Sequence, residues 1–184
     1  MFSDPMFSGR SLLTMMHGIG LGGGALLGLG AALFYLSAVP TRDGAGGPII
    51  ATAAQGRALA WLSAATAGLL WLSVLVGTYI VFPAYRATPP AGATDLAAYP
   101  RALILADPSN AWLHGLAMEI KEHVPFIAAM LATAVAFVAV RERDRLLNDS
   151  ALRRAGLTLL GIAFALVAGV ALLGTLINKF APLE

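Results

Sequence analysis

The sequence from Ala155 to Asn178, AGLTLLGIAFALVAGVALLGTLIN, contains no charged side chain. About 20 apolar residues in a helix cross the roughly 30 Å hydrocarbon core of a bilayer, so this stretch predicts a membrane-spanning helix. The same criterion finds three more such stretches earlier in the chain. The four predicted spans cover residues 11–39, 58–85, 108–140 and 155–178, with a long connection at 86–107. We therefore expect an all-α integral membrane protein in which residues 1–184 form a single membrane domain, a bundle of four transmembrane helices.

The composition agrees with a protein dissolved in lipid. Of 184 residues, 58% are hydrophobic and only 12% are charged, whereas a soluble domain carries about 25% charged residues. The mean hydropathy is +0.77. Because the chain has no cysteine, it cannot form a disulfide framework, a thiolate zinc site, an iron–sulfur cluster or a covalently attached c-type haem. A net charge of +2 with scattered arginines excludes a nucleic-acid surface.

The basic residues predict the orientation of the spans. Seven of the twelve lysines and arginines lie in the links that join span one to span two and span three to span four. These seven are Arg42, Arg57, Arg141, Arg143, Arg145, Arg153 and Arg154. Because basic loops stay on the cytoplasmic side, we expect both termini and the 86–107 connection on the non-cytoplasmic side of a bacterial inner membrane.

The histidines are the polar side chains that most favour a ligand-binding role, because polar groups at membrane depth are costly to keep there. The chain has three of them. At about 1.5 Å per helical residue, His17 and His123 lie roughly 33 and 26 Å above the cytoplasmic ends of spans one and three. Both are therefore expected near the outer edge of the hydrocarbon. His17 also stands above Gly20 and Gly24 on one stripe of its helix.

These positions predict a b-type haem whose two axial ligands are His17 and His123, held between spans one and three. Two imidazoles from separate helices are what a six-coordinate electron-transfer haem needs, and without cysteine its attachment is non-covalent. Gly20 and Gly24 would leave room for the flat macrocycle. His114 is the alternative ligand on span three.

The same residues support a metal-binding hypothesis. His17 and His123, together with the carboxylates of Glu119 and Glu122, form a ligand set suited to copper, zinc or iron. A further interpretation needs no ligand at all, because glycines at helical spacing also allow membrane helices to pack closely. The ionisable residues at the start of span three would then be solvated at the membrane surface.

The sequence accordingly predicts a small membrane subunit of an electron-transfer or energy-conserving complex, respiratory or photosynthetic, with the haem near the outer face. It would pass electrons between a quinol in the bilayer and a soluble carrier outside. The first alternative is a non-catalytic accessory subunit that packs against larger membrane partners, lipids or pigments, and the second is an outer-leaflet metal-binding protein. No recognisable nucleophile or catalytic base pair favours an enzyme.

Overall fold

The computed structural model describes residues 9–38 and 52–181, and this part of the chain contains helices and no strand. Val39 and Arg42, predicted to lie in the first span and the first basic loop, fall outside the described residues. Four helices are long and apolar enough to cross a membrane, which confirms the predicted number of spans. They are Ser11–Ala38, Ala53–Tyr85, Pro108–Arg141 and Ser150–Phe180.

Three of these helices combine α-helical with π-helical segments, which are the elements η1, η2 and η4. The first helix consists of α1 (Gly9–Met15), η1 (Met16–Gly23) and α2 (Gly24–Ala38). The second consists of α3 (Ala53–Val76), η2 (Gly77–Val81) and α4 (Phe82–Tyr85). The third contains the 3-10 turn η3 (Pro108–Asn110), then η4 (Leu113–Met118) and α6 (Glu119–Arg141), and the fourth is α8 (Ser150–Phe180). The connections carry the short helices α5 (Pro100–Ala106) and α7 (Arg143–Asn148).

The second and fourth helices begin earlier than their apolar stretches, because polar residues cap them. Thr52 and Gln55 form a capping box: Gln55 N donates to Thr52 Oγ1 over 3.2 Å, and Thr52 N donates to Gln55 Oε1 over 2.7 Å. At the start of α8 the Asp149 carboxylate accepts from two backbone N–H groups, the nearer being that of Ala151 at 2.9 Å. The first helical turns therefore lie outside the apolar run that hydropathy detects.

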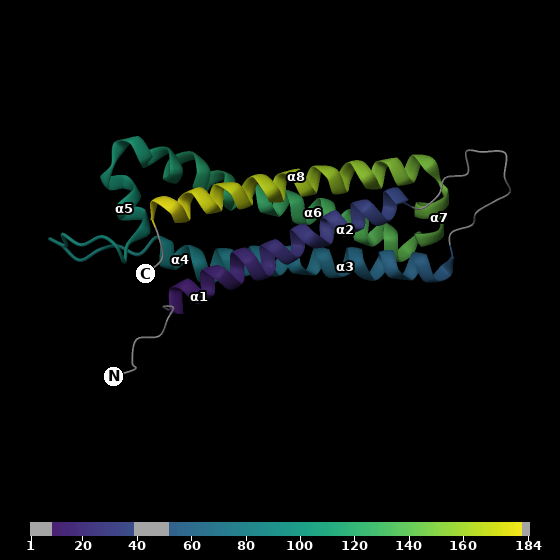
Figure 1. Cartoon of the computed structure of the whole chain (residues 1–184), viewed down its shortest axis with the longest axis horizontal. Helices are drawn as coiled ribbons and strands as arrows, with labels where there is room; N and C mark the ends of the chain where they lie inside the picture. Colours follow the sequence, from purple (N-terminus) through teal and green to yellow (C-terminus); the bar gives the residue numbers. More distant parts are fainter. Residues whose placement is uncertain (1–8, 39–51, 182–184) are drawn as a thin grey trace.

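The four long helices lie side by side along the long axis of the molecule (Figure 1). Each packs against two others, because α3 contacts α2 and α6, and α8 also contacts α2 and α6. Helix α7 lies at one end of this arrangement and α5 at the other, and we call these the α7 end and the α5 end. The start of α1 and the last turn of α8 are both at the α5 end (Figure 1).

Two apolar cores fill the space between the helices. The larger one extends from the α7 end and contains most of the fully buried side chains, among them Leu29, Leu36, Leu59, Val135 and Leu160. The smaller one lies at the α5 end and joins α5 to the third and fourth helices. Its buried members are Tyr85, Ile104, Leu113, Ala117, Met118, Ile177 and Ala181.

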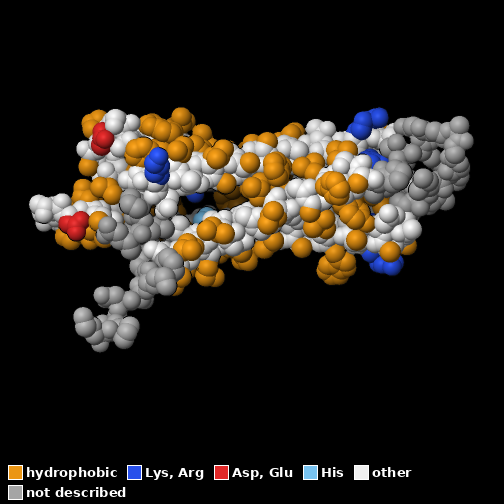
Figure 2. Space-filling model, viewed as in Figure 1, with side chains coloured by type: hydrophobic (Ala, Val, Ile, Leu, Met, Phe, Trp, Pro, Cys, Tyr) orange, Lys and Arg blue, Asp and Glu red, His pale blue; other side chains and the backbone are white. Residues whose placement is uncertain are grey.

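The outer surface of the helices is apolar, as expected where lipid replaces water. Large hydrophobic side chains stand exposed on all four helices, and Figure 2 shows them along the whole length of one face. The most exposed are Ile19, Leu27, Phe34, Trp61, Tyr79 and Leu172. Exposed apolar area on this scale is not found on soluble monomers, so the protein is embedded in a membrane.

Candidate functional site

All three π-helical segments lie in the halves of the helices nearer the α5 end, and two of them carry a histidine. His17 lies in η1 and His114 in η4, while η2 begins at Gly77. A π-turn takes one residue more than an α-turn, so it rotates the side chains that follow it relative to a regular helix. Such segments recur at functional sites in proteins. The half of the molecule nearer the α5 end therefore contains the candidate functional residues.

The imidazole of His17 lies across the second helix. Its Nδ1 is 3.5 Å from Ser73 Oγ, and the ring is half-buried. A β-carbon at position 77 would stand only 2.8 Å from His17 Cε1. The glycine at position 77 is therefore what allows the ring to occupy this place.

Lys121 enters the same level from the third helix. Its side chain crosses to α8, where Nζ lies 3.2 Å from the position that a β-carbon on Gly174 would take. The side chain ends in an ammonium group, whose charge needs a partner within a membrane span. Within residues 9–38 and 52–181, the ion pairs are His123–Glu119 and Arg145–Glu142, and Lys121 belongs to neither. No described carboxylate thus compensates this charge.

We call the set His17, Ser73, Gly77, Lys121 and Gly174 the His17–Lys121 layer; it takes residues from all four long helices and separates the two apolar cores. Figure 2 shows the surface hollowed between α8 and the first helix, with a histidine and a basic side chain visible inside. A cation within a membrane-spanning helix is costly unless a partner compensates it, so an uncompensated one marks a functional site. The layer is the strongest candidate site in the described part of the chain.

A second polar cluster lies closer to the α5 end. Arg101 Nε donates to His114 Nε2 over 3.2 Å, and His114 Nδ1 lies 3.0 Å from the hydroxyl of Tyr85. An accepting ring nitrogen carries no proton, so neutral His114 bears its proton on Nδ1 and donates it to Tyr85. Both ring nitrogens are therefore engaged, and α5 is tied to the second and third helices.

His123 and Glu119 lie on the outward face of α6. Their side chains are 72% and 63% exposed, and His123 Nδ1 is 2.8 Å from the backbone oxygen of Glu119 and 3.8 Å from its carboxylate. His17, by contrast, contacts the second helix. The structure thus gives the two predicted haem ligands different neighbours, and their joint ligation of iron stays a prediction.

The other predicted site residues, Gly20, Gly24 and Glu122, also have different surroundings. Next to Gly20 there is open space, whereas Gly24 contacts Leu69 and Gly28 packs directly on the Thr66 side chain. Across the described ranges, no three histidine or carboxylate side chains converge as a metal site requires, and Glu122 is half-buried. Toward the α7 end, the glycine stripe therefore allows close helix packing, which is the interpretation that needs no ligand.

The layer contains residues that sequence reasoning missed, above all Lys121. A signal for it was present, because positions 121 and 123 are 200° apart on a helix. If His123 faces outward, Lys121 must face inward. The sequence alone does not say which of the two faces is the inner one.

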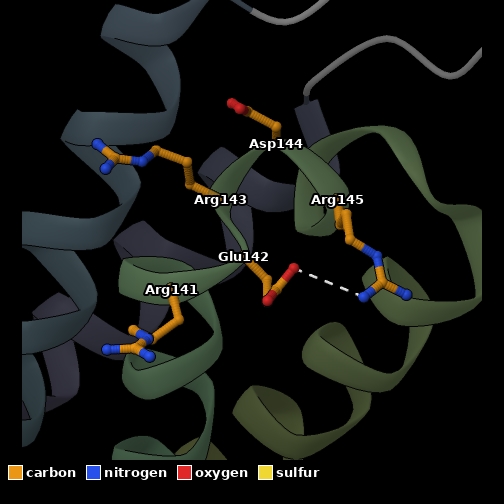
Figure 3. Close-up of a pocket in the computed structure, with 5 residues that line it drawn as sticks. All are labelled: Arg141, Glu142, Arg143, Asp144 and Arg145. Atoms are coloured by element: carbon orange, nitrogen blue, oxygen red, sulfur yellow. Dashed lines mark ion pairs between the residues drawn. The ribbon is translucent and has the colours of Figure 1, made fainter.

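At the α7 end, the turn between α6 and α7 forms a shallow pocket lined by Arg141, Glu142, Arg143, Asp144 and Arg145. Figure 3 shows that its side chains point in different directions, apart from the Arg145–Glu142 ion pair of 3.5 Å. Arg143 packs along Gly56 of α3. The pocket therefore presents no convergent charge to a ligand.

Comparison with known proteins gives no match: no protein-family model, no curated protein and no solved structure is similar to this chain.

Proposed function

We propose that the protein is a small membrane subunit of an electron-transfer or energy-conserving complex, and that the His17–Lys121 layer is its functional element. The proposal includes a four-helix bundle in a bacterial inner membrane with both termini outside. Basic residues support this orientation, because the α6–α7 turn at the α7 end carries Arg141, Arg143 and Arg145, and basic loops stay in the cytoplasm. The layer then lies in the outer half of the bilayer.

One observation carries the proposal: a lysine and a histidine from different helices lie at one level between two apolar cores, and the lysine forms no ion pair with a described carboxylate. Packing alone does not explain an ionisable pair at this depth, since such groups are costly to keep within membrane spans. Groups of this kind in membrane proteins mark pathways for protons, ions or ligands. A subunit that handles a redox ligand or its protons fits this pair.

The proposal includes the predicted b-type haem, which His17 would ligate. The exposed ring of His123 would have to be reached from outside α6, by a partner subunit or by a haem at an interface. An optical spectrum of the protein, oxidised and then reduced with dithionite, tests this directly. Haem ligated by both residues gives an α band that disappears in His17→Ala and equally in His123→Ala.

The complex itself is tested in the native membrane. The tagged chain, solubilised in a mild detergent, should migrate with redox subunits whose haem, flavin or iron–sulfur spectra are reduced by quinol. Membranes with Lys121→Met should lose this quinol-dependent reduction, while membranes with Lys179→Met, at an exposed site in the last turn of α8, should keep it. A chain that migrates alone, or a complex indifferent to Lys121→Met, refutes the proposal. Metal found by elemental analysis in a fixed ratio to the chain would favour the metal-binding alternative instead.

A further inference from the structure

We infer that the His17–Lys121 layer binds the ring of a membrane quinone between the first, third and fourth helices. This inference rests on the proposed function and names the ligand of its site. Three properties of the layer support quinone binding: its open space, its hydrogen-bonding groups and its access to the membrane.

The space next to the layer is made by glycines. Gly77 and Gly174 leave room for the His17 ring and the Lys121 side chain themselves, because a β-carbon at either position would meet those groups. Along η1, Gly20 lies about one helical turn after His17, and a β-carbon there would meet no atom within 4 Å. Helix surfaces without side chains are flat, and a planar ring can lie against them at close range. The hollow between α8 and the first helix in Figure 2 opens at this level.

The hydrogen-bonding groups suit a quinone better than a phosphate. The ammonium of Lys121 only donates, whereas a neutral imidazole donates from one nitrogen and accepts at the other. A quinone presents two carbonyl oxygens at opposite edges of its ring, and a quinol presents two hydroxyls. Lys121 can therefore donate to one oxygen while His17 bonds to the other in either redox state. A phosphate headgroup carries full negative charge on several oxygens, and the layer offers it a single cation.

Access to the layer is from the lipid. Large apolar side chains cover the outer faces of the first helix and of α8, including Ile19 and Leu172, each two residues from a member of the layer. A ligand that arrives this way must be soluble in the bilayer and must carry its polar atoms at one end. Membrane quinones have this form, with a polar ring and a long apolar tail that can remain among the lipids.

Binding can be measured with the isolated full chain in phosphatidylcholine nanodiscs, titrated with decylubiquinone by calorimetry. We expect saturable binding with one site per chain. Lys121→Gln should weaken it at least about 10-fold, since a hydrogen bond to a charged group is lost, and His17→Gln should also weaken it. The matched control Lys179→Gln removes the same residue type as Lys121→Gln at an exposed position and should leave the affinity unchanged.

Gly174→Ala provides a test that keeps both polar groups. Its methyl group would stand 3.2 Å from Lys121 Nζ, so it should weaken quinone binding while the protein stays folded. No binding to the unaltered chain, or equal affinity in Lys121→Gln, His17→Gln and Gly174→Ala, overturns the inference. The inference is also overturned if phosphatidylglycerol added to the nanodiscs stabilises the protein through Lys121 while quinone does not bind. Because this assay uses the isolated chain, its failure is distinct from the absence of a redox complex in the native membrane.

Discussion

Gly77→Ala is the sharpest perturbation of the layer, because it changes no polar group. The added β-carbon would stand 2.8 Å from His17 Cε1 and 3.3 Å from Nε2. Carbon atoms in contact prefer about 3.5–4.0 Å, so the ring must move by about 0.7–1.2 Å. Overpacking of this kind costs about 1–3 kcal/mol. Alanine gains about 1 kcal/mol over glycine in a helix, so the net destabilisation should be about 0–2 kcal/mol.

Gly68→Ala is the matched control on the same helix. A β-carbon there meets no atom within 4 Å, so this variant should show the helix-propensity gain alone. The difference between the two variants, about 1–3 kcal/mol, is then the cost of the clash with His17. Reversible unfolding in mixed micelles, followed by far-ultraviolet circular dichroism, measures both free energies.

A double-mutant cycle assigns the clash to His17. In a His17→Ala background the imidazole is gone, and Gly77→Ala should become as favourable as Gly68→Ala. A coupling free energy near zero, or a Gly77→Ala protein as stable as the control, would show that the ring does not lie against the second helix. The geometry of the layer would then be wrong, whatever the ligand.

Three further predictions concern the helix packing and the helix ends. Gly28→Ala should destabilise by about 1–3 kcal/mol in the same unfolding assay, because its methyl group would overlap the Thr66 side chain, whereas Gly20→Ala, beside open space, should not. Thr52→Ala should cost about 1 kcal/mol through loss of the capping box at the start of α3, and Thr52→Ser should restore it. Backbone hydrogen bonds hold the pKa of Asp149 below its usual value, so its cap stabilises α8 above the pKa of the unfolded chain and loses that effect as pH falls through the folded pKa. In an unfolding series from pH 6 to pH 2, the free energy of unfolding of the unaltered chain should fall as Asp149 is protonated. The fall should be smaller in Asp149→Asn, whose amide oxygen caps the helix without titrating.

The sequence was sufficient for the helices because hydropathy is a property of one segment at a time. Four long apolar stretches implied four spanning helices, and the structure contains them. The exact start of the second helix was less accessible, since Thr52 and Gln55 extend it with residues that are themselves polar. A capping residue acts through geometry at one turn, and average hydropathy does not register it.

The site was harder to predict because it depends on helix rotation. His17 was singled out from the sequence as a candidate ligand, and the structure places its ring against Ser73 and Gly77 of the second helix. The regular 100° step used to place side chains also fails within η1 and η4, where the helix is π-helical. Neither the inward face of α6 nor the π-turns can be read from hydrophobic periodicity, since both faces of these helices are apolar.

The two halves of the molecule differ in a way that bears on function. Toward the α7 end, small residues and leucines pack the four helices closely, and Arg153 of α8, buried at 6% exposure, donates to the backbone oxygen of Ser37 near the end of α2. Toward the α5 end, the same helices contain π-turns, open glycines and an uncompensated lysine, each of which lowers stability. Natural proteins tolerate such features where function requires them and compensate elsewhere. The closely packed half therefore provides the stability that lets the other half keep a polar layer open to the membrane.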